Sequence, residues 1–369
     1  MPTRRRLLFA AAASTLGLGL ALAAVEIWLR SREGPTPLRW GWRDPYVLAG
    51  LRPAAEVNEF GYRGRAVRYD DGDFVVVLVG DSQVQADACP FEQMPERRLQ
   101  HHLQARLARP VQVFTLGALG YGTDQQSLAL DEYFARHRAD LVVVWITPGN
   151  DLRDNLLPIA PVPKPTFWLD GGGRLCGPTA TIDAPVPSGL RALQYLKDIV
   201  RGPLVEYWHA HILPPPGLHP SEPDGPVTTD WGVIKLAGDD LRREITNVLV
   251  ELDPPSPRAR YAVDLMRALL RRMQTAAAAH GARFAGLLDD RTDFPLPDGL
   301  YLAELAGERH YLRLSLAAYR ENIARLTEGL GFVRVPVTTR PFVAGPADPH
   351  LNAAAVDQVM AGLAAGLPF

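Results

Sequence analysis

The sequence predicts an α/β fold in which parallel strands alternate with helices. Three near-continuous apolar runs, at residues 74–79, 111–116 and 141–146, are each bounded by turn residues. Such runs are typical of strands buried on both faces of a parallel sheet. Two further apolar runs, at residues 283–288 and 331–337, follow a long irregular stretch. Because helical patterns separate these runs, we expect one parallel sheet with right-handed crossovers.

The segments between the strands carry apolar residues at helical spacing, which predicts an amphipathic helix in each. The clearest pattern is at residues 258–280, where Tyr261, Leu265, Leu269 and Met273 recur every four residues. The expected helices are at residues 95–107, 125–137, 258–280, 311–330 and 353–363.

The sequence also indicates three regions. Residues 1–30 form an amino-terminal apolar segment, residues 31–73 a polar linker with a packed connecting segment, and residues 74–369 the α/β domain. Within that domain, residues 155–254 are rich in proline and glycine and form an insertion with little regular periodicity. Long irregular loops in compact domains often act as lids or binding surfaces, so the insertion is a candidate for substrate selection or else a passive decoration.

The amino terminus indicates export. Arg4, Arg5 and Arg6 precede residues 7–25, a stretch of 19 residues without a charge. As a helix this stretch is about 28 Å long, close to the thickness of a bilayer's hydrocarbon core. Two alternatives remain open: an uncleaved helix that anchors the domain in the inner membrane facing the periplasm, or a signal peptide cleaved after Ala21-Leu22-Ala23, which releases the domain into the periplasm.

Composition excludes several classes of protein. The net charge of −2 gives no reason to expect a nucleic-acid partner. Two cysteines are too few for a disulfide-rich scaffold or a four-cysteine zinc site. Cys89 and Cys176 either pair in an oxidising compartment or stay as separate thiols.

Four short motifs stand at the expected ends of strands or before the last helix. Gly80-Asp81-Ser82 follows the first strand, a glycine-rich turn at residues 117–122 follows the second, and Gly149-Asn150-Asp151 follows the third. Asp348-Pro349-His350 precedes the final helix. The carboxyl ends of parallel strands share one edge of a sheet, where such folds build their sites.

These residue types suit acyl transfer by a serine nucleophile. Ser82 would attack, His350 would act as its base, and Asp348 would orient the imidazole. The developing oxyanion would accept hydrogen bonds from the backbone N–H groups of Ser82 and Gly120 and from the side-chain amide of Asn150.

Each motif also has a plainer interpretation. Ser82 alone is more simply the capping residue of the next helix. The glycines of residues 117–122 suit turns that need positive φ, Asn150 and Asp151 suit a helix cap, and His350 suits an exposed surface. It is the order of all four motifs at four neighbouring positions that favours a catalytic site.

The set resembles the SGNH hydrolases, also called GDSL-type esterases, over residues 74–363 outside the insertion. Ser82, Gly120, Asn150 and His350 match the serine, glycine, asparagine and histidine for which that family is named. The resemblance implies a flavodoxin-like three-layer sandwich around five parallel strands, with no metal and no cofactor. It also implies chemistry on acyl esters, with Ser82 as nucleophile, His350 as base and Asp348 as its orienter.

Two spacings differ from the family pattern: Gly149 directly precedes Asn150, and Asp348 lies two residues before His350. The expected function is an exported esterase acting on short-chain or acetyl esters, with an envelope or exported polysaccharide as one candidate substrate. Two alternatives stay open, an O-acyltransferase with the same residues and an inactive glycan-binding domain. The sequence makes no prediction about oligomeric state.

Overall fold

The computed structural model of the chain describes residues 2–32, 40, 52–156, 164–178, 219–220, 249–255, 257–291, 298–305, 308–337 and 350–369. The chain forms two compact units. The first comprises Met1–Pro37, Arg43–Ala54 and Pro185–Pro216. The second comprises Leu38–Trp42, Ala55–Ala184 and Gly217–Phe369. In the first unit, helix α1 (Pro2–Arg32) includes the predicted amino-terminal helix. Within the described parts of the chain, no helix has the length and apolarity needed to cross a membrane.

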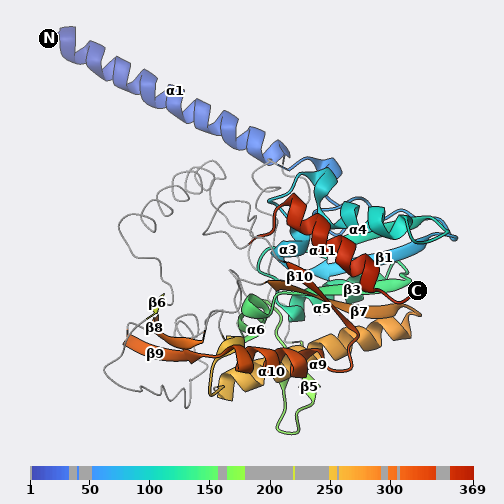
Figure 1. The fold of residues 1–369 in the computed structure, drawn as a ribbon. Helices are drawn as coiled ribbons and strands as arrows, with labels where there is room; N and C mark the ends of the chain where they lie inside the picture. The colour runs from blue at the N-terminus through green and yellow to red at the C-terminus, as the bar shows by residue number, and fades with distance from the viewer. Residues whose placement is uncertain are drawn as a thin grey trace. The chain divides into compact units, whose positions relative to one another are not determined.

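The second unit is built on a sheet of five parallel strands, as predicted (Figure 1). The strands are β1 (Phe74–Gly80), β2 (Val111–Gly117), β3 (Leu141–Ile146), β7 (Arg283–Arg291) and β10 (Phe332–Val337), in the spatial order β10-β7-β3-β1-β2. Every residue of β1 and β3 is buried. This burial on both faces explains why their sequences are apolar without alternation.

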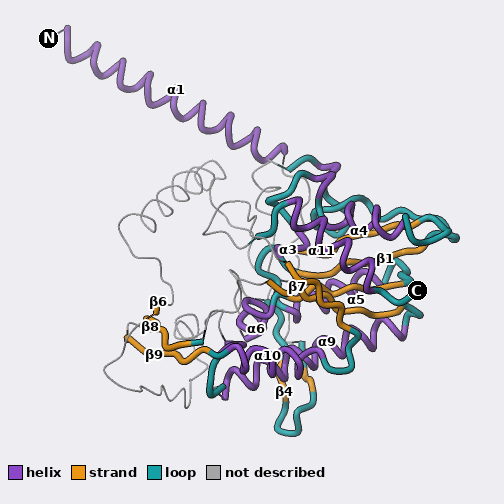
Figure 2. The backbone as a smooth tube through the Cα atoms, in the orientation of Figure 1, coloured by secondary structure: helices purple, strands orange, loops and turns teal. Residues whose placement is uncertain are grey.

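Helices cover both faces of this sheet (Figures 1 and 2). One face packs against α3 (Ser82–Gln85), α4 (Pro95–Gln104) and α11 (Ala353–Gly366). The other packs against α5 (Thr123–Phe134), α9 (Pro257–Ala279) and α10 (Leu316–Thr327). Successive residues of β1 alternate between the two cores: Val76 and Leu78 face α4 and α11, whereas Val77 and Val79 face α5 and α9.

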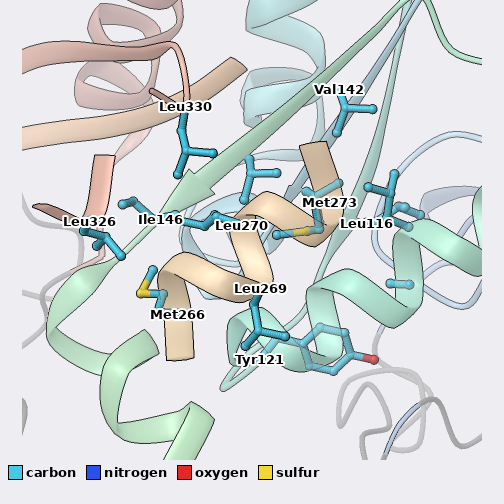
Figure 3. Packing of buried hydrophobic residues seen from close by; sticks show 14 of the residues in the cluster. Leu116, Tyr121, Val142, Ile146, Met266, Leu269, Leu270, Met273, Leu326 and Leu330 are labelled. Atoms are coloured by element: carbon cyan, nitrogen blue, oxygen red, sulfur yellow. The ribbon is translucent and has the colours of Figure 1, made fainter. Parts of the chain in front are cut away.

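Helix α9 shows why its sequence pattern was the clearest. Met266, Leu270 and Met273 point from α9 toward the sheet, where Val142 and Ile146 lie (Figure 3). All five side chains are fully buried. Full burial of such a side chain contributes roughly 1.5–3 kcal/mol, which is enough to hold an amphipathic helix against the strands.

The predicted helix at residues 311–330 is wrong in its first part. Residues Glu308–Leu314 form strand β9, which pairs antiparallel with β8 (Gly299–Leu305). The other edge of β8 pairs antiparallel with β6 (His219–Pro220). Helix α10 begins only after Ser315, whose hydroxyl caps it by accepting from Ala317 N at 3.2 Å. A short apolar run is compatible with either a helical or a strand period, and pairing with β8, which ends at Leu305, stabilises the strand here.

The remaining short elements flank this frame. They are the 3₁₀ turns η1 (Ala54–Glu56), η2 (Phe91–Gln93) and η3 (Leu249–Glu251), helix α6 (Pro148–Leu156), and the two-stranded β4 (Trp168–Leu169) and β5 (Leu175–Cys176). Helix α6 runs to Leu156, just past the predicted start of the insertion at residue 155. Most of residues 155–254 lie outside the described part of the chain.

Candidate active site

The turn after β1 carries Ser82 at the carboxyl edge of the sheet. The amino-terminal cap of α3 is Asp81, whose Oδ1 accepts a hydrogen bond from Gln83 N at 2.8 Å. The interpretation of Ser82 as the capping residue is therefore wrong. Burial raises the pKa of Asp81, and its hydrogen bond with Asn150 opposes that shift.

Two strand-end glycines let α3 pack directly over the sheet edge. A Cβ atom on Gly117 would lie 2.6 Å from the side chain of Val84 and 2.9 Å from Gln85 N. A Cβ on Gly80 would lie 2.5 Å from Val84. Real Cβ contacts are not this short, so only glycine allows the short helix that carries Ser82 to approach β1 and β2 this closely.

The glycine-rich turn brings Gly120 to the same edge. Its φ of +73° lies in the left-handed region that favours glycine. The preceding residue, Leu119, donates its backbone N–H to the side-chain oxygen of Gln85 in α3. The loop that carries Gly120 is thus tied to the helix that carries Ser82.

Asn150 lies in the first turn of α6, after β3. Its Nδ2 donates to Asp81 Oδ2 at 2.9 Å. Asp81 therefore orients the amide of Asn150 and also begins the helix of Ser82, so one carboxylate holds two of the predicted site residues.

The buried carboxyl group of Asp151 links the start of α6 to α5 through two hydrogen bonds. Its Oδ2 accepts from Thr147 N at 2.7 Å, and its Oδ1 accepts from Gln126 Nε2 at 3.3 Å. The same amide nitrogen donates to Tyr121 O at 3.3 Å, in the glycine-rich turn. Burial, with the charge of Asp81 as a lesser cause, raises the pKa of Asp151 well above its ordinary value.

A buried ion pair lies at the start of α5. Lys164 Nζ donates to Asp124 at 2.8 Å and 2.6 Å, and both side chains are almost inaccessible to solvent. Asp124 N in turn donates to Asn155 Oδ1 at 3.1 Å in α6. Burial raises the pKa of Asp124, and the charge of Lys164 opposes that shift.

The loop that carries His350 is attached to α3 and the turn after it. Leu351 N donates to Gln83 Oε1 at 3.3 Å, and the Cys89 thiol donates to Leu351 O at 3.6 Å. Asn352 then caps α11 by accepting from Ala354 N and Ala355 N at 3.0 Å. Asp348, the predicted orienter of His350, lies outside the described residues.

These loops enclose a pocket of about 290 Å³. Its lining residues are Asp81, Ser82, Gln83, Leu119, Gly120, Thr147, Pro148, Gly149, Asn150, Arg153, Asp154, Leu288, Asp289, Tyr319 and His350. Four sequence-predicted site residues, Ser82, Gly120, Asn150 and His350, thus meet around one cavity, although they come from four separate parts of the chain.

Sequence reasoning missed several polar residues of this pocket: Gln83, Arg153, Asp154, Asp289 and Tyr319. Asp289 could have been found, since it directly follows the predicted strand at residues 283–288 and strand ends carry the site in such folds. Gln83 and Tyr319 carry no comparable sequence signal.

Cys89 and Cys176 do not form a disulfide in the structure. Burial raises the pKa of Cys89 to about 11, so its thiol stays protonated at neutral pH. Among the side chains that the structure describes, no three His, Cys, Asp or Glu residues are grouped so that they could hold a metal ion.

Comparisons with known proteins add little to this geometry. No protein-family model matches the chain, and a search of curated proteins finds no match. Among solved structures, the chain is similar to LAE5, an α/β hydrolase enzyme from the metagenome of Lake Arreo, Spain. The two share 11% sequence identity with a TM-score of 0.35, over 81% of this chain and 96% of that one.

Proposed function

We propose that this chain is a serine esterase of the SGNH type, with Ser82 as nucleophile and His350 as general base. The observation that carries the proposal is the common pocket lined by Ser82, Gly120, Asn150 and His350. The resemblance of the four sequence motifs to that family supports the same roles. Asp348 is proposed to orient His350, on the sequence pattern alone.

The proposed reaction begins when Ser82 Oγ attacks the ester carbonyl carbon and gives its proton to His350. The carbonyl electron pair moves onto oxygen, which accepts hydrogen bonds from the backbone of Ser82 and Gly120 and from Asn150. The carbonyl re-forms as the bond to the alcohol breaks, and the alcohol leaves with the proton from His350. In the second half-reaction, a water molecule attacks the carbonyl carbon of the acyl-enzyme and gives its proton to His350. The bond to Ser82 Oγ then breaks, Ser82 takes the proton back from His350, and the acid leaves.

The pocket favours a short acyl group. Its volume of about 290 Å³ is at the lower limit of ordinary small-molecule sites. Leu119, Pro148 and Leu288 supply apolar wall. Leu119 is also 46% exposed, beside Gly120. We therefore propose acetyl or other short-chain esters as substrates.

Labelling with a fluorophosphonate probe tests the nucleophile. We expect an adduct on Ser82, mapped by mass spectrometry, and loss of both adduct and short-chain aryl-ester hydrolysis in Ser82→Ala and His350→Ala. His280→Ala is the matched control, because His280 directly follows α9, is exposed, stacks on Phe134 and does not line the pocket. Undiminished hydrolysis by a folded Ser82→Ala enzyme would refute the assignment.

We also propose that the amino-terminal apolar segment, residues 7–25, directs export, as a cleaved signal or a retained anchor. Fusion of residues 1–40 to a reporter that is active only in the periplasm tests export, and amino-terminal sequencing of the product separates the two forms. Replacing Arg4, Arg5 and Arg6 with glutamate should reduce reporter activity, because basic residues retain the amino terminus in the cytoplasm. Equal reporter activity in the wild-type fusion and in the fusion with glutamate at positions 4, 5 and 6 would count against an export signal.

A further inference from the structure

Asp289 lies at the carboxyl end of β7 and lines the pocket that contains Ser82 and His350. Its side chain is nearly buried, with 6% of the residue exposed. The indole of Trp145, which is fully buried on the neighbouring strand β3, donates from Nε1 to Asp289 Oδ1 at 2.9 Å. An indole N–H is a neutral donor, so it orients the carboxylate without cancelling its charge.

Strand alternation puts Asp289 on the side of the sheet that α4 and α11 cover. Leu287 packs in the core beneath α4 and α11, whereas Leu288 packs in the opposite core, so Asp289 faces the α11 side. Leu351, which directly follows His350, is buried in that same core. Asp289 thus lies on the side of the sheet where Leu351, the chain neighbour of His350, is buried, and Asp289 and His350 line the same pocket.

Four other ionisable side chains line the pocket: Asp81, Arg153, Asp154 and Tyr319. Asp81 caps α3 and holds Asn150, and its charge also acts on His350. Asp154 accepts from Arg153 at 2.8 Å and 2.7 Å, so this pair is neutral as a unit. Burial raises the pKa of Tyr319, which keeps its phenol neutral near physiological pH.

We infer that Asp289 is a positioning residue for His350: its carboxylate, oriented by Trp145, stabilises the imidazolium that forms when Ser82 gives up its proton. The inference rests on the proposed function of Ser82 and His350. It adds a carboxylate from the sheet to the one proposed on the histidine's own loop, Asp348. A carboxylate close to an imidazole favours the charged form of the imidazole, so removing this charge makes the imidazolium less stable.

The pH dependence of Ser82 labelling measures this directly, because a fluorophosphonate reacts when His350 is neutral and can accept the serine proton. We expect the midpoint of the labelling rate to lie about one pH unit lower in Asp289→Asn than in wild type. Ester hydrolysis in that variant should fall at least about tenfold in kcat. Asparagine keeps the size of the side chain and an oxygen for the Trp145 N–H.

Asp290→Asn is the matched control. Asp290 is the next residue of β7, but it pairs with Arg334 at 2.6 Å on the surface and does not line the pocket. Its labelling midpoint should equal that of wild type. Should Asp289→Asn fail to fold, Trp145→Phe provides the same reading, because it keeps the carboxylate and removes the indole donor that orients it.

The outcomes separate the two proposals. An adduct on Ser82 with a lowered midpoint in Asp289→Asn or Trp145→Phe, and an unchanged one in Asp290→Asn, supports the inference. An adduct on Ser82 with coincident midpoints in all variants overturns the role of Asp289 and leaves the proposed esterase intact. Absence of any Ser82 adduct in the folded wild-type protein overturns both.

Discussion

The side-chain oxygen of Gln83 accepts a hydrogen bond from the backbone N–H of Leu351 at 3.3 Å. These residues are 268 positions apart in the chain, yet each directly follows a residue of the proposed catalytic pair, Ser82 and His350. Because this hydrogen bond is buried, water cannot readily replace either partner, and losing it would leave a buried polar group unsatisfied. This hydrogen bond fixes the distance between the turn that carries Ser82 and the loop that carries His350.

We therefore expect Gln83→Ala to lower kcat by about tenfold to a hundredfold, because small displacements of reacting groups are costly. KM should stay near its wild-type value, since Gln83 is not proposed to bind the ester. Steady-state kinetics on an aryl acetate measures both constants. Gln358→Ala, the same substitution on the exposed side of α11, is the control, and equal kcat in the two variants would contradict the positioning role.

Asn150→Ala should lower kcat by roughly a hundredfold to a thousandfold, as expected when one oxyanion donor is lost. Asn150→Asp should be at least as impaired, because a carboxylate would then face Asp81 Oδ2 across a contact that is now 2.9 Å. Far-ultraviolet circular dichroism checks that both variants fold. A folded Asn150→Ala enzyme with wild-type kcat would exclude this amide from the oxyanion site.

Asp151 should make the protein less stable as the pH rises. Its folded-state pKa is raised, so its contribution to the free energy of unfolding is complete below its unfolded pKa of about 3.9. That contribution is lost as the pH increases toward the folded-state pKa, by up to about 1.4 kcal/mol per pH unit.

Asp151→Asn cannot ionise and lacks this loss. In urea unfolding between about pH 4.5 and 7.5, we expect the variant to gain stability relative to wild type as the pH rises. The comparison isolates this carboxyl, since the other buried acids are present in both proteins. Parallel stability curves across the range would show that Asp151 has an ordinary pKa.

Lys164→Met should destabilise the fold by about 3–5 kcal/mol, because it leaves the carboxylate of Asp124 buried without its cation. The double substitution Lys164→Met with Asp124→Asn should recover part of that loss. Arg325→Met provides the contrast: its pair with Asp264 is of similar length, 2.6 Å, but is exposed, so its loss should cost under about 1 kcal/mol. Equal losses for the two single variants would contradict this ranking.

Gly117→Ala should destabilise the protein by about 1–3 kcal/mol, because the new methyl group would push against Val84 and the backbone of α3. The displaced α3 carries Ser82, so kcat should fall as well. Gly72→Ala is a matched control, since a Cβ there meets nothing within 4 Å. Thermal unfolding and steady-state kinetics of both variants provide the test, and a fully active, fully stable Gly117→Ala protein would show that α3 adapts without cost.

Local sequence patterns were sufficient for the five parallel strands and for most of the helices. Strands such as β1 and β3 are buried on both faces, so their continuous apolar runs carry the signal without help from other segments. The grouping of Ser82, Gly120 and Asn150 could also be predicted. Parallel topology alone brings the residues that follow β1, β2 and β3 to one edge of the sheet.

Features that depend on contacts between elements were not predictable in this way. Residues 311–314, the second half of strand β9, were expected to begin a helix, because a short apolar pattern is compatible with both periods until β8 pairs with it. The plainer interpretation of Ser82 gave it the capping role that Asp81 has in the structure, since either residue type can begin a helix.

The sequence by itself therefore determined the sheet, its carboxyl edge and the residues that gather there. Only the tertiary structure decided how those residues are held: Gln83 against Leu351, Asp81 against Asn150, and Trp145 against Asp289. The physical reason is that the pattern of apolar residues within one segment is enough to predict which of its side chains are buried. A hydrogen bond between segments depends on distances and directions that exist only once both are packed.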